Sequence, residues 1–414
     1  MKRFALNPIT KTAMLTVAFA GDFFRNALTT PVWFGIAVLV GLLGAYLTIK
    51  NREHLNRVPK TFLLLLGWWV LTPLWSPYPL TSLGLTLGAI LTALIGFGLS
   101  LTMPATQFAK QAQLSLRILL IGSLIFEVII GIAGNPIFPV GMATDQATSI
   151  ELAWSRAQIL QPGERIQGLV GNANLLGMLA LLLLILAATR LFTGGVFSFT
   201  AIIDFLVASL TILLTASATV TVALLVAAIA IALMILWRRK TLLSKIAIAV
   251  FGAGIIAGVG LATSNWSAFT ALLGKSSDLT HRFDIWNAVM GKIADNPWFG
   301  HGFVGWWPNW EAWFAIQQIR GIPVSQAHNL WLDLLMQTGI IGTLIVTAAA
   351  VATLIGLTRR LLNDFTWANA AWLAIFVAML VQSTTESRML TEWGLVLFAA
   401  LAVYAKPGRA KSAL

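Results

Sequence analysis

Long apolar runs separated by short polar segments make up most of this sequence. A membrane-spanning helix needs roughly 20 predominantly apolar residues, within a range of about 17–25. Runs of this kind lie at residues 9–24, 31–49, 61–76, 81–103, 114–134, 168–188, 198–215, 218–237, 243–264, 329–356, 366–383 and 390–405. The pattern predicts an all-α polytopic membrane protein, a single integral membrane domain over residues 1–414 with about twelve transmembrane helices.

The composition agrees with this pattern and narrows the chemistry. Hydrophobic residues make up 58% of the 414 residues and charged residues 10%, whereas a soluble domain averages about 25% charged residues. The chain has no cysteine, which excludes disulfides, thiolate metal sites and cysteine nucleophiles. The net charge of +12 comes from short loops between apolar runs. It therefore indicates orientation in a membrane and not a nucleic-acid-binding face.

The basic residues are distributed unequally between the two sides of the predicted bundle, and cytoplasmic loops are the ones rich in lysine and arginine. One side contains Lys2, Arg3, Lys11, Lys50, Arg52, Arg57, Lys60, Lys110, Arg117, Arg190, Arg238, Arg239, Lys240, Lys245, Arg359, Arg360, Lys406, Arg409 and Lys411. The other side contains only Arg25, Arg156, Arg165, Lys275, Arg282, Lys292, Arg320 and Arg388. This imbalance predicts that both termini are cytoplasmic.

The first apolar run has an alternative interpretation. Lys2 and Arg3, a short apolar stretch and the small residues of 18–21 resemble a signal peptide. Cleavage there would remove one span and leave every later loop on the same side.

Two segments on the predicted external side, 135–167 and 265–328, are longer than the roughly 12–15 residues of ordinary connections. The second contains an amphipathic stretch from His281 to Ile293, followed by a breaker-rich turn at 296–303. We expect this large loop to bear amphipathic helices and to fold against the outer membrane face. Its tryptophans include Trp306, Trp307 and Trp310, which we expect to contact glycan or lipid. An ordinary interfacial tryptophan belt is the alternative.

His328 stands where this loop meets the next apolar helix. Asn329 is a good N-cap residue and Asp333 lies in the first turn that follows. The positive end of a helix dipole disfavours imidazolium, so the position favours a neutral base. The alternative is an interfacial or capping histidine without a catalytic part.

Arg165 and Arg282 also lie next to predicted membrane elements on the external side. A guanidinium is always charged and binds phosphate oxygens in a bidentate manner, so two of them suit a lipid-linked diphosphate. The alternatives are contact with lipid headgroups and pairing with the nearby acids Glu164 and Asp284.

The last external turn, 382–388, contains Glu386 and Arg388. Glu386 could orient His328 or Arg282, but their proximity in sequence favours a pair between Glu386 and Arg388. The chain contains none of the D-x-D, H-E-x-x-H, P-loop or G-x-S-x-G motifs. We therefore expect no metal, no cofactor and no serine nucleophile, and arginine must neutralise any phosphate.

The motifs together resemble the O-antigen ligase/polymerase superfamily, which includes WaaL-type ligases, Wzy- and ExoQ-type polymerases and pilin oligosaccharyltransferases. The residues that carry the resemblance are Leu74–Leu83, Arg165–Gly177, Arg282–Trp286, Asp295–Phe303, Ala327–Asn329 and Gly339–Gly342. The chain departs from the family at Thr215–Thr219, where many members have a Ser-Arg pair.

The resemblance implies a metal-independent, GT-C-like glycosyltransferase of the bacterial cytoplasmic (inner) membrane, acting on its periplasmic or external side. The donor would be a glycan on undecaprenyl diphosphate. His328 would be the general base, Arg165 and Arg282 would bind the diphosphate, and Glu386, Asn329 and Arg388 would support them. A direct displacement would invert the anomeric centre.

Two further functions remain open beside a ligase that uses lipid A–core or a similar acceptor. The turn at Thr385–Ser387 resembles ExoQ-type polymerases, which extend a lipid-linked growing chain. A transporter or flippase of lipid-linked glycans is the third possibility. Transporters place ionisable residues near the bilayer midplane, where Glu127 is the main candidate in this chain.

Overall fold

The computed structural model describes residues 6–142, 149–159, 161, 163–193, 198–246, 264, 282–319 and 322–406. The α-helices are α1 (Pro8–Phe19), α2 (Gly21–Ala27), α3 (Thr30–Lys50), α4 (Lys60–Leu71), α5 (Pro79–Thr102), α6 (Ala105–Ala133), α7 (Ala173–Thr193), α8 (Phe199–Thr215), α9 (Ala218–Arg239), α12 (Arg282–Asp295), α13 (Ala312–Ala315), α14 (Leu330–Asn363), α15 (Trp367–Gln382) and α16 (Glu392–Ala405). Short 3₁₀ turns are η1 (Arg52–Arg57), η2 (Thr72–Leu74), η4 (Ile150–Leu152) and η5 (Arg388–Leu390). The strands β1 (Gln318–Ile319) and β2 (Ile322–Pro323) pair antiparallel.

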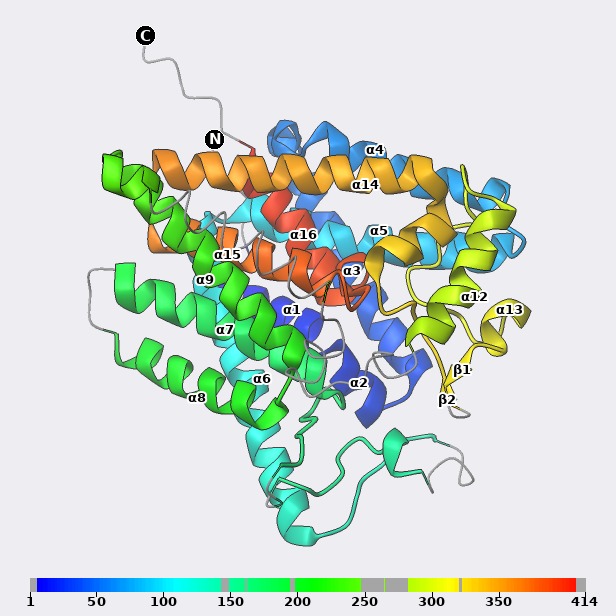
Figure 1. Ribbon diagram of the computed structural model, residues 1–414. Coiled ribbons are helices and arrows are strands. Elements are labelled where there is room, and N and C mark those ends of the chain that lie inside the picture. Colours follow the sequence, from blue (N-terminus) through cyan, green and yellow to red (C-terminus); the bar gives the residue numbers. More distant parts are fainter. Residues whose placement is uncertain are drawn as a thin grey trace.

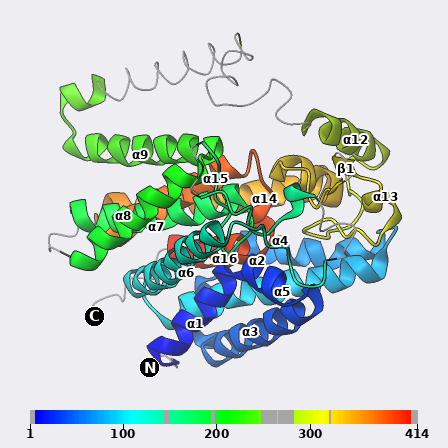
Figure 2. The same ribbon diagram turned by 90° about the horizontal axis from the view of Figure 1, so that it is seen from below.

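The long helices form a bundle whose centre is unusually apolar (Figures 1 and 2). All residues of α16 from Trp393 to Ala405 are buried, and α15 is buried along most of its length. α3 packs against α5, α7 against α8, α15 against α9, and α16 against α5. α12, α13 and the β1–β2 hairpin gather at one end of the bundle, beside the start of α14. We call this the loop end.

The prediction of an all-α polytopic membrane protein is confirmed. Within the described residues, six helices are long and apolar enough to cross a membrane: α3, α5, α6, α7, α9 and α14. Four shorter apolar stretches are Lys60–Leu74, α8, α15 and α16. Each of these helices occupies the place of a predicted span. The total of about twelve spans stays a prediction, and the span predicted at 243–264 lies almost wholly outside the described residues.

The span predicted at 9–24 forms two helices. α1 ends at Phe19 and α2 begins at Gly21, because Ala20 between them departs from helical geometry with φ −96° and ψ 18°. Asp22 of α2 forms ion pairs with Arg25 and Arg388. The break therefore turns α2 toward charged partners.

Glycine sets the start of α7 five residues later than predicted. Gly168 and Gly171 have φ of +59° and +67°, and the amide of Gly171 donates to the carbonyl of Gly168 at 3.1 Å. This turn ends at Asn172, whose Oδ1 accepts from the amides of Asn174 and Leu175. Glu127, the candidate for a mid-membrane transport residue, accepts from the amides of Gln167 and Gly168 and from Ser155 Oγ. Its carboxylate thus anchors this loop.

A kink in α14 receives the turn that follows α12. Gly339 has φ +66° and ψ −173°, and a Cβ added there would lie 2.2 Å from the carbonyl oxygen of Trp298. The amide of Ile340 donates to the carbonyl of Pro297 at 2.8 Å, and His301 N donates to Met336 O at 2.9 Å. The interrupted helix therefore satisfies the backbone of the turn, which fixes the loop end onto the bundle.

The predicted amphipathic stretch is α12 from Arg282 onward, and His281 lies outside the described residues. Ile285 and Val289 are buried, whereas Phe283 and Met290 are exposed. The buried pair belongs to a second hydrophobic cluster, which we call the loop core and which consists of Ile285, Val289, Val304, Trp307, Phe314, Val324, Ala327 and Met336. The helix thus presents an apolar face away from the protein as well as toward it. Such a helix is typical of a membrane interface.

Candidate active site

The junction before α14 holds His328 in a constrained backbone conformation. Asn329 caps the helix as predicted, since its Oδ1 accepts from the amides of Trp331 at 3.0 Å and Leu332 at 3.3 Å. His328 has φ +49°, in the left-handed region, which costs a non-glycine residue about 1–3 kcal/mol. Ala327 N donates to the buried Asp333 Oδ2 at 3.0 Å. The surrounding contacts thus hold a strained turn that directs the imidazole.

His328 and Glu386 are the central pair of the site. His328 Nδ1 lies 3.2 Å from Glu386 Oε2, and the Glu386 side chain is 5% exposed. A carboxylate at Nδ1 accepts its proton and leaves Nε2 with a free lone pair. Nε2 has no protein hydrogen-bond partner among the described residues. This arrangement gives the neutral imidazole one basic nitrogen that is available to a ligand.

Arg282 pairs with the other carboxylate oxygen of Glu386. Its Nη2 is 3.7 Å from Glu386 Oε1. Burial alone would raise the pKa of Glu386, but His328 and Arg282, with a contribution from Arg388, bring that pKa below its ordinary value. Burial lowers the pKa of Arg282, which Glu386 partly offsets. The structure therefore brings together three of the predicted site residues, His328, Arg282 and Glu386.

The turn that carries Glu386 is fixed by Gln326 and Asp333. Gln326 Nε2 donates to Glu386 Oε2 at 2.6 Å, and its Oε1 accepts from the amide of Ser387 at 2.6 Å. Ser387 Oγ donates to Asp333 Oδ2. The carboxylate of Asp333 thus connects the start of α14, the loop before His328 and the turn after α15. Sequence reasoning missed Gln326, and its position two residues before His328 was the only signal.

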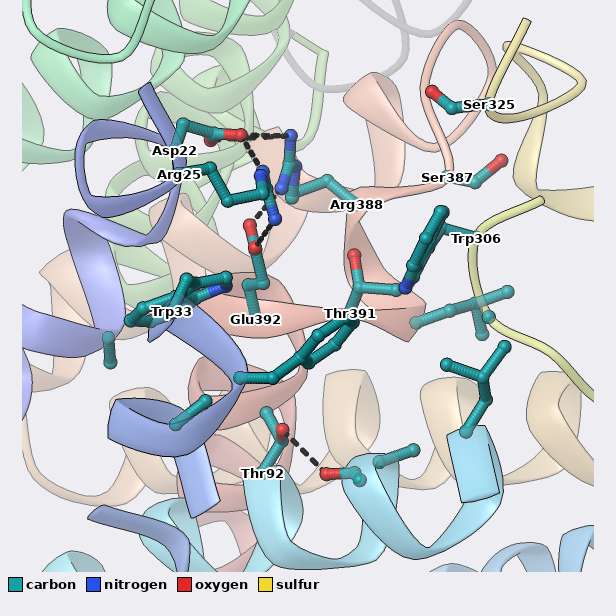
Figure 3. Close-up of a pocket in the computed structure, with 18 of the residues that line it drawn as sticks. Asp22, Arg25, Trp33, Thr92, Trp306, Ser325, Ser387, Arg388, Thr391 and Glu392 are labelled. Carbon is teal, nitrogen blue, oxygen red and sulfur yellow. Dashed lines mark hydrogen bonds and ion pairs between the residues drawn. The ribbon is translucent and has the colours of Figure 1, made fainter. Parts of the chain in front are cut away.

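The predicted pair between Glu386 and Arg388 is wrong. Arg388 forms ion pairs with Asp22 and Glu392, and Arg25 pairs with the same two acids. The four side chains alternate in charge around a closed ring, which Figure 3 shows. We call it the charge ring. It joins α2, η5 and the start of α16.

A cavity of about 520 Å³ extends from this site into the bundle. Its polar end includes His328, Glu386, Arg388 and Arg25, and its apolar walls come mainly from α3 and α5. This volume lies within the range of about 300–1,000 Å³ that is usual for ligand pockets. Arg25 was not among the predicted site residues, although a basic residue on the external side was a signal in the charge pattern.

Arg165 lies apart from this group and does not line the cavity. Its Nε donates to the carbonyl of Thr215 at 2.7 Å and its Nη2 to Asn174 Oδ1 at 2.8 Å. Burial and the nearby Arg156 lower the pKa of Arg165. No ion pair joins Arg165 to Glu164 within the described residues. The segment at Thr215–Thr219, where the chain departs from the family pattern, is thus the segment that Arg165 contacts.

The three predicted tryptophans differ in exposure. Trp306 lines the cavity, and its ring centroid is 6.3 Å from Phe34 and 5.5 Å from Trp310. Trp310 is 57% exposed. Trp307 is 1% exposed and donates from Nε1 to Asp333 Oδ1 at 2.7 Å. Trp307 is therefore part of the loop core, while Trp306 and Trp310 remain accessible to a ligand.

Comparison with known proteins gives one family. Residues 203–347 match the family model described as O-antigen ligase. A search of curated proteins gave no match. The matched segment includes Arg282, His328 and the kink at Gly339, and it ends before Glu386. The match covers about a third of the chain and supports a relationship to the O-antigen ligase/polymerase superfamily.

Proposed function

We propose that this protein transfers a preassembled glycan from undecaprenyl diphosphate to a hydroxyl group of lipid A–core or a similar acceptor. It would act at the outer face of the bacterial inner membrane, as a GT-C-like enzyme with both termini in the cytoplasm. The observation that carries the proposal is the contact of His328 Nδ1 with a buried Glu386, which also pairs with Arg282. His328 and Glu386 both line the cavity. The match of residues 203–347 to the O-antigen ligase family model supports the class of reaction.

His328 is the proposed general base. Nε2 takes the proton of the acceptor hydroxyl as that oxygen attacks the anomeric carbon. The bond between this carbon and the diphosphate oxygen breaks, and undecaprenyl diphosphate leaves. Glu386 holds the ring in the required tautomer and stabilises the imidazolium that forms, as a buried carboxylate does beside a catalytic histidine. A single displacement inverts the anomeric configuration.

Arg282 is the proposed electrophilic partner of the leaving group. Negative charge accumulates on the diphosphate as the glycosidic bond breaks, and a fixed guanidinium stabilises that charge without metal. Arg165 is the second proposed diphosphate ligand. Both of its hydrogen-bond partners are neutral acceptors, so its positive charge is not neutralised by them.

A polymerase would use the same chemistry with a lipid-linked growing chain as acceptor. The two activities differ only in the acceptor hydroxyl, so the site residues are shared. Transport without chemistry has less support. Glu127 was the residue that suggested transport. Both of its carboxylate oxygens accept hydrogen bonds, one from Ser155 and the other from the amides of Gln167 and Gly168.

The test is an assay with purified protein in lipid nanodiscs. Undecaprenyl diphosphate glycan would be supplied with lipid A–core in one reaction and with a second lipid-linked glycan in another. We expect glycosylated lipid A–core and released undecaprenyl diphosphate, both lost in His328→Ala. Extension of the lipid-linked glycan alone would identify a polymerase. If neither product forms and no diphosphate is released, the enzymatic function is wrong.

A further inference from the structure

Trp306 and Trp310 form a corner of two aromatic rings at the loop end. Their ring centroids are 5.5 Å apart and the ring planes meet at 80°. Trp306 lines the cavity that contains His328 (Figure 3), whereas Trp310 lies outside the cavity lining and is 57% exposed. We call this pair the tryptophan corner. It continues the site of the proposed reaction outward, onto a surface that a ligand can reach.

A carboxylate lies beside the exposed ring of the tryptophan corner. Trp310 Nε1 donates to Thr81 Oγ1 at 3.3 Å, and Thr81 Oγ1 donates in turn to Glu311 Oε1. Within the part of the chain that the structure describes, Glu311 forms no ion pair and its Oε2 has no hydrogen-bond partner. Glu311 therefore has one carboxylate oxygen that can accept a hydrogen bond from a ligand.

The backbone that carries the tryptophan corner is fixed by the protein itself. The amides of Val304 and Gly305 donate to Gln337 Oε1 at 3.0 and 2.9 Å. The amide of Trp307 donates to the carbonyl of Ser325 at 2.8 Å. An aromatic surface on a fixed backbone loses little conformational entropy when a ligand binds. The corner is thus preorganised for a ligand.

These features fit a pyranose ring and not a lipid. The C–H bonds on one face of a sugar ring pack against the electron-rich face of an aromatic ring, while the hydroxyls donate to a carboxylate. A carboxylate without a cation is costly against an acyl chain and repels the phosphate of a lipid headgroup. Thr81 lies in the first turn of α5, a helix long and apolar enough to cross a membrane. The corner therefore lies at the level where a lipid-anchored glycan leaves the membrane.

We propose that Trp306, Trp310 and Glu311 bind a pyranose ring of a substrate glycan, with the ring stacked on Trp310 and a hydroxyl on Glu311 Oε2. This inference rests on the proposed function, because it takes the substrates to be glycans. The glycan of the donor and the core sugars of the acceptor both contain such rings, and the experiments distinguish these two sources. Because Trp310 and Glu311 lie outside the lining of the cavity that contains His328, they determine KM and not kcat.

The first experiment is oxidative footprinting with mass spectrometry, which needs no transfer reaction. Wild-type protein in nanodiscs would be oxidised by hydroxyl radicals with and without two soluble probes. One probe is the donor glycan freed of diphosphate and lipid, and the other is the core oligosaccharide freed of lipid A. Trp298 is the matched control, because it is 59% exposed and lies in the turn that follows α12.

We expect one probe to slow the oxidation of Trp310 severalfold and to leave that of Trp298 unchanged. The probe that protects Trp310 identifies the substrate that supplies the ring. No protection by either probe, or equal protection of Trp298, would overturn the inference. A Trp310 that does not react in nanodiscs without any probe lies in lipid, which would also overturn it in favour of an interfacial tryptophan.

The second experiment separates this inference from the proposed function. Trp310→Ala removes the ring, so we expect KM for one glycan substrate to rise about tenfold, the scale of a lost aromatic contact, with kcat unchanged. Trp310→Phe keeps an aromatic face and should recover most of the loss. Glu311→Gln keeps an acceptor oxygen but loses the charge, so it should raise the same KM by a smaller factor.

Trp298→Ala is the control for these variants and should behave as wild type. A wild-type KM for both substrates in Trp310→Ala and in Glu311→Gln contradicts the glycan site while leaving the transferase intact. Absence of transfer in the wild type itself contradicts the proposed function instead.

Discussion

Gln326 Nε2 donates at 2.6 Å to the oxygen of Glu386 that also faces Nδ1 of His328. The proposed base is therefore oriented by a carboxylate that is itself held by an amide. The same amide accepts from Ser387 N at 2.6 Å, so one side chain fixes both the carboxylate and the backbone that carries it.

Replacing Gln326 tests this relationship. Gln326→Ala frees Glu386 to rotate, so we expect kcat to fall about tenfold with little change in KM for donor or acceptor. Gln326→Glu places a second carboxylate against Glu386 and should lower kcat further, because like charges raise the pKa of the pair. Steady-state kinetics over a pH series would check both variants. An unchanged pH profile in Gln326→Glu would contradict a positioning role.

Removal of the base should be the most severe single change. His328→Ala is expected to reduce kcat about 10²–10⁴-fold while the protein keeps its fold and its affinity for the donor. His54→Ala is the matched control, because His54 lies in η1, far along the chain from the site. Release of undecaprenyl diphosphate provides the measurement. If His328→Ala transferred glycan as fast as wild type, the proposed role of His328 as general base would be wrong.

Arg282 offers a test of charge against geometry. Arg282→Ala should lower kcat/KM about 10²–10³-fold, the usual cost of a lost electrostatic donor. Arg282→Lys keeps the charge but loses the fork that binds two phosphate oxygens, so we expect it to recover only part of the loss. Lys292→Ala, in the same helix, is the control. Equal activity in Arg282→Ala and wild type would exclude a role in binding the diphosphate.

The ion pair of Glu386 predicts a stability effect at acid pH. The pKa of Glu386 in the folded protein lies below its ordinary value of 4.5. A depressed pKa contributes stability that is present above the unfolded value and is lost as pH falls through the folded value. The stabilisation of wild type relative to Glu386→Gln that comes from this carboxylate should thus shrink as the pH falls below about 4.5. Thermal unfolding in detergent would measure it, and a difference that grows on acidification would contradict the assignment.

The sequence predicted those features that depend on local pattern. Apolar run length predicted the apolar helices, and the capping residue Asn329 with its neighbour His328 identified the junction. Arg282 and Glu386 were assigned from their side of the membrane, and the fold brings both to His328. The positions followed from periodicity, caps and charge asymmetry, whereas the proposed roles of His328 and Arg282 also depended on the resemblance to a known family.

Tertiary partners account for what the sequence could not predict. Glu386 and Arg388 are close in sequence, yet each finds its partner in another element: Arg388 pairs with Asp22, 366 residues away. Trp306 and Trp307 are adjacent tryptophans, but only Trp306 lines the cavity. Trp307 is buried and donates a hydrogen bond to Asp333. Only the folded chain distinguishes such neighbours. Gln326 was missed because its position two residues before His328 was its only signal, and the glutamine side chain by itself indicates no particular role.

The charge ring has a consequence for the order in which the molecule is completed during synthesis. Arg25 and Glu392 are 367 residues apart, so Arg25 is translated long before its partner in the ring. Arg388 and Glu392 come from η5 and the start of α16, so the ring cannot close before α16 has been synthesised. The ring therefore closes only after the helices between α2 and α16 have been synthesised.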